Sequence, residues 1–175
     1  MRISLRAVLI GLIALVAIGG LIGTGVISTA PNASIVQPSK TLGFCSSSGV
    51  SLVIDNGTTA EPHCAFGFKG TGWELFAATS QKVSGTTEYP VGFVCRINDV
   101  PSVAAQPCTS TPTSAQGSWV YYFANPETGN HWMFSGAGAS MRKPQCGSVD
   151  GWVFVGPGEK AHEPSIAPLT RKCSQ

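Results

Sequence analysis

The amino-acid sequence predicts an α+β fold in which one short helix packs on a mainly antiparallel sheet. Three observations predict this class. A single helix-start pattern stands near residue 71, strand patterns lie on both sides of it, and six cysteines follow residue 44. The cysteines indicate that disulfides stabilise the domain. We expect an additional apolar helix at the N-terminus.

The first thirty residues are typical of an export signal. Arg2 and Arg6 form a short basic segment, and residues 7–27 contain no charged side chain. A signal peptide usually has a shorter apolar segment, whereas about 20 residues span a bilayer. Residues 1–30 are therefore expected to be either a cleaved signal peptide or a single-pass anchor. A retained anchor would keep its basic end in the cytoplasm and the rest of the chain outside.

Residues 31–44 are rich in Pro and Ser, so we interpret them as a linker that precedes a folded domain at 45–175. The whole chain carries a formal net charge of +2. Arg2 and Arg6 account for this excess, so the exported part is neutral. A neutral module lacks the basic surface that nucleic acids or anionic lipids require, and we predict no nucleic-acid partner.

The first strand and the helix have clear sequence signals. Residues 50–54 are β-branched and apolar, and the turn-forming segment 55–57 follows them. Thr71 is placed to cap a helix, and Glu74 stands three residues later to complete a capping box. We expect this helix to be short, to cover residues 70–78 and to be the only one in the exported domain.

Four strand patterns follow the helix, at residues 89–97, 119–123, 131–134 and 151–155. In the first, Val91, Phe93 and Cys95 are expected on one side of the strand and Val94 on the other. The second and third form an aromatic hairpin around a turn at residues 125–130. The last is an apolar strand entered from a turn at 147–150.

The cysteines predict three disulfides and an extracellular location, or a location on the outer face of the plasma membrane. The six are Cys45, Cys64, Cys95, Cys108, Cys146 and Cys173. Cys95 and Cys108 are the pair that we expect first, because closing so short a loop contributes about 3 kcal/mol in the chain-entropy model. The pairing of the other four is left open, although a bond from Cys173 to a distant cysteine would tie down the C-terminal tail.

Motifs for catalysis or metal binding are absent from the sequence. There is no HExxH, no CxxC and no Gly-x-Ser-x-Gly, so we predict no enzyme, no catalytic residue and no cofactor. His63 adjoins Cys64 and His131 follows a turn, so metal ligands can converge. A surface histidine beside a disulfide and a polar residue at a strand start are the simpler interpretation, and we predict no metal site.

The aromatic hairpin is the strongest candidate for a functional surface. Six aromatic side chains lie close together in the sequence: Trp119, Tyr121, Tyr122, Phe123, Trp132 and Phe134. One set faces the core, and the other set, Tyr122 with Val120 and Trp132, faces the opposite side of the sheet. Aromatic sheet faces bind flat ligands through apolar contact. The alternative is that the helix covers one face and long cysteine-linked loops cover the other.

Five segments resemble, in the same order, the domain at the C-terminal end of transcobalamin and intrinsic factor. They are residues 51–55, 72–78, 92–101, 119–123 and 147–154. The segments also resemble small exported actinobacterial proteins that are typically encoded beside energy-coupling-factor transporter genes. The resemblance implies a β-grasp-like fold and a role in holding a corrinoid or similar ligand outside the membrane. It also implies that Trp119, Tyr121 and Tyr122 form the aromatic strand and that Trp152 lies on the strand that closes the sheet.

Two hypotheses follow for the function. The first is a small-ligand-binding module, accessory to a transporter, whose ligand-binding residues are Trp119, Tyr121, Tyr122, Trp132 and Trp152. The vitamin carriers cover the ligand with a large helical domain that this chain lacks, so a partner would have to supply that half. The second is a protein–protein interaction module of the cell envelope that binds no small molecule.

Overall fold

The computed structural model describes residues 40–46 and 48–173. The expected N-terminal apolar helix, and with it the choice between signal peptide and anchor, lies outside these residues. No helix within the described part of the chain is long and apolar enough to cross a membrane.

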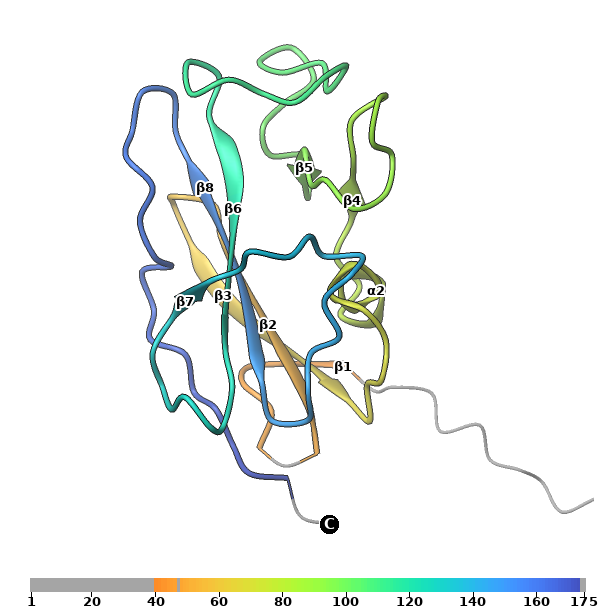
Figure 1. Cartoon of the computed structure of the whole chain (residues 1–175), viewed down its shortest axis with the longest axis vertical. Coiled ribbons are helices and arrows are strands. Elements are labelled where there is room, and N and C mark those ends of the chain that lie inside the picture. The colour runs from red at the N-terminus through yellow and green to blue at the C-terminus, as the bar shows by residue number, and fades with distance from the viewer. Residues whose placement is uncertain (1–39, 47, 174–175) are drawn as a thin grey trace, which may run out of the picture. The chain divides into compact units, whose positions relative to one another are not determined.

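The described chain is built around one six-stranded sheet with the strand order β1-β3-β2-β8-β6-β7 (Figure 1). The strands are β1 (Lys40–Leu42), β2 (Gly49–Asp55), β3 (Ala60–Phe66), β6 (Ser118–Ala124), β7 (Met133–Phe134) and β8 (Val149–Val155). The central pair, β2 and β8, is parallel. The other pairs of this sheet are antiparallel, which confirms the α+β class with a mainly antiparallel sheet.

The helix α2 (Gly72–Ala78) forms as its sequence pattern predicts. The Thr71 hydroxyl accepts a hydrogen bond from the Glu74 N–H at 3.3 Å, and the Glu74 carboxylate accepts one from the Thr71 N–H at 2.7 Å. Both halves of the capping box are therefore present. Leu75 and Phe76 are fully buried, so the apolar side of this single helix anchors it to the sheet.

The sheet has two buried faces, each with its own cluster of apolar side chains. The first face carries Leu52, Ile54, Trp119, Tyr121 and Trp152, packed against Leu75 and Phe76 of α2. The second face carries Val53, Tyr122, Trp132, Val149, Val153 and Val155, with Ile166 packed against them. Since both faces are covered, every residue of β2 is buried.

The C-terminal tail, residues 156–173, covers the second face. In Figure 1 it runs along the left side of the sheet in dark blue, with α2 on the right. The Trp132 indole N–H donates to the Ile166 carbonyl at 2.9 Å, and the Ser165 N–H donates to the Asp55 carboxylate at 2.7 Å. The tail therefore takes the place of a second helical layer.

All six cysteines are paired. The expected Cys95–Cys108 disulfide is present. Cys45–Cys64 joins the segment before β2 to β3, and Cys146–Cys173 ties the end of the tail to the segment before β8. Disulfide stabilisation of the domain is thus confirmed, and the tail is tied down as expected.

The predicted strand at 89–97 is wrong for most of its length. Only Arg96–Ile97 is a strand (β5), and it pairs with Val83–Ser84 (β4) in a separate two-stranded sheet. Pro90 has no N–H to donate to a ladder, and Gly92 has a φ of +106°. The expected alternation also fails, because Val91 is exposed.

Three other boundaries differ from the prediction. Lys40–Leu42 pairs with β3, so part of the expected linker belongs to the sheet. The return strand of the aromatic hairpin is limited to Met133–Phe134, and the last strand begins at Val149, earlier than residue 151. β3 was not predicted, because Glu61, Pro62 and His63 interrupt its apolar pattern; Pro62 is tolerated because β1 pairs only with residues 63–65 of β3.

Candidate functional site

The five residues predicted to bind a ligand are all buried, with exposed fractions between 4% and 8%. Trp119, Tyr121 and Trp152 lie on the first face of the sheet, and Tyr122 and Trp132 lie on the second. The two sets are therefore on opposite faces, as the alternation predicts. The tail covers Tyr122 and Trp132, so the alternative holds in which both faces are covered, the first by the helix and the second by a cysteine-linked segment.

A groove opens at the first face beside the aromatic residues. It consists of two adjoining cavities of about 250 Å³ and about 330 Å³, which share Gly92, Phe93 and Gly138 among their lining residues. Trp119, Tyr121 and Trp152 line the first cavity. Three of the five predicted residues therefore lie together at one open site.

The groove has an aromatic floor. Tyr121 and Trp152 are opposite each other on neighbouring strands, and their rings stack with centroids 4.3 Å apart and an angle of 6° between the planes. Trp119 lies on the same face, and its indole N–H donates to the Val100 carbonyl at 2.9 Å. The rings are held in fixed orientations, which suits recognition of a rigid ligand.

Two segments without regular secondary structure form the walls. One contains Gly92 and Phe93, and the other contains Gly136, Ala137 and Gly138. A Cβ atom placed on Gly138 would lie 3.5 Å from the Gly92 carbonyl oxygen, so the two walls approach each other closely at this point. Small residues in both walls leave space for the cavity beside the aromatic floor, although Trp119, Tyr121 and Trp152 are themselves at most 6% exposed.

Exposed apolar side chains gather at the rim of the groove. Tyr89, Val91 and Phe134 line the two cavities, and Met141 directly follows the lining residue Ser140. Their exposed fractions lie between 49% and 79%. Exposed apolar side chains beside an apolar cavity are typical of surfaces that bind a ligand or a partner.

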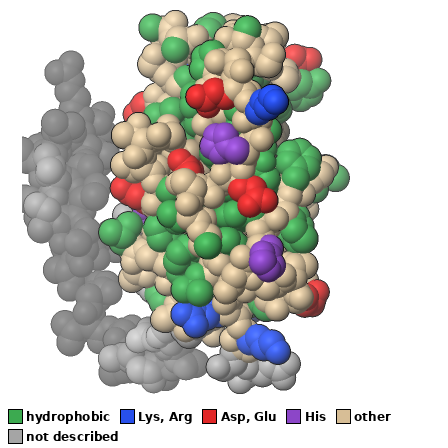
Figure 2. All heavy atoms as spheres, turned by 90° about the vertical axis from the view of Figure 1, so that its left-hand side faces the viewer, with side chains coloured by type: hydrophobic (Ala, Val, Ile, Leu, Met, Phe, Trp, Pro, Cys, Tyr) green, Lys and Arg blue, Asp and Glu red, His purple; other side chains and the backbone are tan. Residues whose placement is uncertain are grey.

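The opposite side of the molecule has a different character. Figure 2 shows the side on which the tail lies, where acidic, basic and histidine side chains are scattered among hydrophobic ones. A polar cavity of about 270 Å³ is lined there by Asp55, Glu159 and His162. No cluster of three side chains suited to hold a metal ion occurs among the residues that the structure describes.

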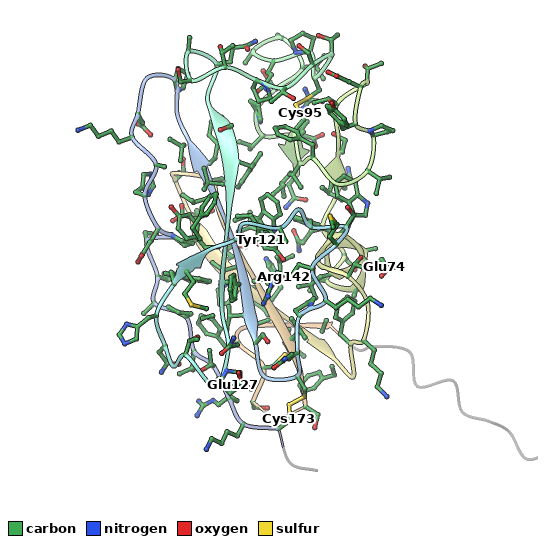
Figure 3. All side chains as sticks on the ribbon, in the orientation of Figure 1. Glu74, Cys95, Tyr121, Glu127, Arg142 and Cys173 are labelled. Carbon is green, nitrogen blue, oxygen red and sulfur yellow. A yellow bond between two sulfur atoms is a disulfide. The ribbon has the colours of Figure 1, made fainter. Side chains whose placement is uncertain are left out.

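A buried polar cluster supports one wall of the groove. The carboxylate of Asp150 is fully buried, and Arg142 donates to its Oδ1 from Nε at 3.2 Å and from Nη2 at 3.1 Å. The Tyr121 hydroxyl donates to Oδ2 of the same carboxylate. The guanidinium of Arg142 also lies 3.9 Å from the centre of the Phe123 ring. Figure 3 shows Tyr121 and Arg142 between the sheet and the helix.

Burial governs the ionisation of this cluster. It raises the pKa of Asp150, although the charge of Arg142 and the hydrogen bonds from Tyr121 and Arg142 oppose the shift. Burial and the neighbouring Asp150 carboxylate raise the pKa of Tyr121 well above its ordinary value, so the phenol is protonated at neutral pH. Tyr121 therefore serves as a neutral hydrogen-bond donor and as a flat apolar surface.

The same cluster connects the groove to the helix. The Gly72 N–H donates to the Arg142 carbonyl at 2.9 Å, and the Trp73 N–H donates to the Ala139 carbonyl at 3.0 Å. The segment that follows Gly138 is thus held at the start of α2 and at Asp150. Hydrogen bonds to α2 and to Asp150 therefore hold this wall of the groove in place.

Sequence reasoning missed the walls of the groove and the Asp150 cluster. The small-residue segment 135–140 is a signal for close backbone approach, and Asp150 is an isolated acidic residue inside an apolar strand. Each signal is visible in the sequence, but no sequence pattern predicts that residues 92–93 and residues 136–138 lie close together in the fold. Comparisons of the chain with family models, with curated proteins and with solved structures found no match.

Proposed function

We propose that this chain is an exported or membrane-anchored module that holds a flat, largely apolar small molecule in the groove, as an accessory to a transporter. The observation that carries the proposal is the stacked Tyr121–Trp152 pair at the floor of an open cavity with an exposed apolar rim. Such concave apolar sites with few polar groups are the usual form of small-molecule sites.

The aromatic lining supports a flat ligand. The walls come into near contact at Gly92 and Gly138, and the cavity beside this point is lined by Trp119, Tyr121 and Trp152. A planar ring system inserted there would contact Trp152 or Trp119 through its face or its edge.

The strand order supports the finer fold assignment, a β-grasp-like sheet. In that fold the first and last strands are parallel neighbours at the centre, each flanked by its antiparallel partner, with a helix on one face. The order β3-β2-β8-β6-β7 with parallel β2 and β8 has this arrangement. It agrees with the transcobalamin-like resemblance, which remains part of the proposal.

A corrinoid is the ligand that this resemblance implies. Its macrocycle is wider than either cavity, so only an edge or a side group would enter the groove. The remaining surface of the ligand would need a second protein. We therefore propose a transporter component or another envelope protein as the partner that covers the exposed side.

The disulfides support the proposed location. Three cystines in one small domain are typical of proteins that fold in an oxidising compartment. We propose that the domain lies outside the cytoplasm, either released or held at the outer face of the plasma membrane.

The second candidate function is that of an interaction module that docks another envelope protein and binds no small molecule. The exposed rim residues Tyr89, Val91 and Phe134 favour it, because aromatic and branched apolar side chains at an open surface also suit protein contacts. The two candidates differ in whether the cavity beneath the rim is filled by a ligand.

Filling the cavity tests the proposal. Gly138→Leu places a large side chain between the walls without a backbone clash, since its Cβ would make only ordinary contact. The full chain is titrated with a panel of corrinoids and with the planar dye anilinonaphthalene sulfonate, followed by fluorescence. We expect saturable binding to the wild type and at least about tenfold weaker binding to Gly138→Leu, a difference of about 1.4 kcal/mol.

Ala104→Leu is the matched control, because Ala104 is exposed and lies outside both cavities. It should bind as the wild type does. If the wild type binds none of the compounds, binding of these ligands by the chain alone is excluded. Recovery of one specific envelope protein by a photocrosslinker at Val91 would then favour the interaction module.

A further inference from the structure

The strand β6 is covered by another strand along only part of its outer edge. On one side all seven of its residues pair with β8. On the other side β7 pairs only with Tyr122 and Phe123, and one further bond runs from the Ser135 N–H to the Tyr121 carbonyl at 2.9 Å. After Ser135 the chain leaves the sheet and crosses in front of it toward α2 (Figure 1). Within the described part of the chain, the first half of β6 therefore has no strand beside it on this side.

The alternation of the backbone decides which groups face this open edge. The bond from Ser135 shows that the main chain of Tyr121 points away from β8. In an antiparallel strand the N–H and C=O of one residue point to the same side, and every second residue shares that side. The Tyr121 N–H and both main-chain groups of Trp119 therefore point toward the open edge. None of these three groups has a hydrogen-bond partner among residues 40–46 and 48–173.

The pairing of β8 gives the same alternation independently. The Ser51 N–H donates to the Ser148 carbonyl at 3.0 Å, so the main chain of Ser148, and of every second residue after it, faces β2. The intervening residues face β6, and among them Val153 is opposite Val120. Val120 thus exchanges its hydrogen bonds with β8, and its two neighbours in β6 face the open edge.

The larger part of the groove's aromatic lining belongs to this edge. Three consecutive residues of β6, namely Trp119, Val120 and Tyr121, line the cavity of about 250 Å³. Consecutive side chains point to opposite faces, so contact with all three places the cavity along the main chain of β6. Phe134 and Ser135, from the β7 side, line the same cavity. The unpartnered main-chain groups and the cavity therefore lie together.

Unpaired main-chain groups at a strand edge are a template for another extended chain. A partner residue opposite Trp119 would exchange two hydrogen bonds with it and would direct its side chain to the first face, where Trp119, Tyr121 and Trp152 line the cavity. The residues before and after it would point to the second face, beside Val120 and Phe134. The Phe134 side chain is 67% exposed there. Both surfaces are apolar.

We propose that the groove binds an extended apolar segment of another protein, which adds to β6 as a strand in line with β7 and places one aromatic or branched side chain in the cavity. This inference rests on the second candidate function, the interaction module, and specifies how its partner is recognised. Because the segment and a small ligand would use the same cavity, each would exclude the other.

Short peptides of defined sequence test the proposal. The probes are acetylated and amidated heptapeptides Lys-Thr-Val-Xaa-Val-Thr-Lys, in which Xaa is Val, Phe, Tyr or Trp. Each is titrated into the full chain, and binding is followed by calorimetry. We expect saturable binding that is tighter for an aromatic residue at the centre than for valine, since the aromatic ring buries more area in the cavity.

N-methylation of the peptide separates strand addition from simple apolar contact. A methyl group on the central nitrogen removes the N–H that donates to the Trp119 carbonyl, and we expect affinity to fall at least about tenfold. A methyl group on the next valine modifies the opposite edge of the same peptide, and affinity should change less than about threefold. Equal losses for the two peptides would contradict strand addition.

Amide hydrogen exchange locates the added strand on the protein. In the free chain the amides of Trp119 and Tyr121 should exchange faster than those of Val120 and Tyr122, which bond to β8. Saturation with the unmodified peptide should slow exchange at Trp119 and Tyr121 at least about tenfold and leave Val120 and Tyr122 nearly unchanged. Bound peptide without added protection at Trp119 would overturn the proposal.

A variant at the rim tests the second-face contact. Phe134→Ser removes an exposed ring beside the open edge, so the peptide should bind at least about threefold more weakly. Val103→Ser is the matched control, because Val103 is equally exposed and lines neither cavity of the groove. It should bind the peptide as the wild type does, and equal weakening in both variants would count against this docking position.

The remaining outcomes distinguish this inference from the functions on which it builds. If none of the four peptides binds at ~1 mM, strand addition is overturned. Recovery of an envelope protein by the crosslinker at Val91 would in that case leave the interaction module standing without it. Corrinoid binding without peptide binding would assign the cavity to a small molecule. A dimer of the chain that the peptide dissociates would assign the edge to a second copy and overturn the proposal of a different partner.

Discussion

At the scale of single residues, Asp150 has the largest influence on the site. It is a fully buried carboxylate in the central strand β8, and it binds Arg142 and Tyr121. Gly72 lies against it as well, since a Cβ there would come within 2.5 Å of the Tyr121 hydroxyl. Glycine at the helix start thus allows the cluster, the helix and the groove wall to meet.

Asp150→Asn removes the negative charge and leaves Arg142 partly buried without its partner. We expect a loss of about 3–5 kcal/mol in the free energy of unfolding, as for other broken buried ion pairs. Tyr121→Phe removes one hydrogen bond and should cost less, about 1–3 kcal/mol. Urea unfolding of both variants checks the order. Equal stability of Asp150→Asn and the wild type would show that the cluster does not hold the fold.

At the scale of elements, α2 depends on its surroundings. Seven residues are too few for a stable isolated helix, so the capping box and the packing of Leu75 and Phe76 must hold it. The Thr71 hydroxyl is the side-chain acceptor for the Glu74 N–H at the helix start.

Thr71→Ala should lower the free energy of unfolding by about 0.5–2 kcal/mol, because the Glu74 N–H loses its acceptor. Thr87→Ala is the control, since Thr87 is exposed and its side chain makes no hydrogen bond to a described residue. Its effect should stay within about 0.5 kcal/mol. Thermal and urea unfolding give both values, and identical losses in the two variants would contradict the role of the cap.

Elements with a local signal were predictable, and those formed by distant segments were not. The helix was found because Thr71 and Glu74 carry its start signal within four residues. The strands β6 and β8 were found from their apolar runs. The segment 89–97 failed because alternation alone cannot reveal that Pro90 and Gly92 interrupt a ladder.

The same contrast between local signals and contacts of distant segments explains which residues of the site could be predicted. Alternation along β6 correctly separated Tyr121 from Tyr122, so three floor residues of the groove could be named. Covering of Tyr122 by a cysteine-linked segment was one of the alternatives that the sequence left open, but the contacts of the tail were not predictable. Residues 156–173 have neither helical nor strand periodicity, and hydrogen bonds such as Trp132 to Ile166 join positions far apart in the sequence.

At the scale of the whole molecule, the tail functions as the second layer of the fold. It has no helix or strand of its own, so its position depends on side-chain contacts, on single hydrogen bonds such as that from the Arg171 N–H to the Gly147 carbonyl, and on the Cys146–Cys173 disulfide. Closing a loop of 27 residues contributes about 3–4 kcal/mol in the chain-entropy model.

Replacing Cys146 and Cys173 together by serine should release the tail and expose Tyr122 and Trp132. We expect the tail to become sensitive to limited proteolysis, and the free energy of unfolding to fall by about 3 kcal/mol. The matched variant replaces Cys95 and Cys108, which lie in the loops near the groove, and should leave the tail protected. A tail that resists protease equally in both variants would show that side-chain contacts suffice to hold it.

The parallel neighbours β2 and β8 have a consequence for biosynthesis. In a nascent chain β2 emerges before the other strands of its sheet except β1, and β8 is the last of the described strands to emerge, so the middle of the sheet stays open until β8 has been delivered. Pairing of strands so distant in sequence is also intrinsically slow. Closure of the native core therefore waits for β8, and the Cys146–Cys173 disulfide, whose second cysteine follows β8, is the last of the three that can form.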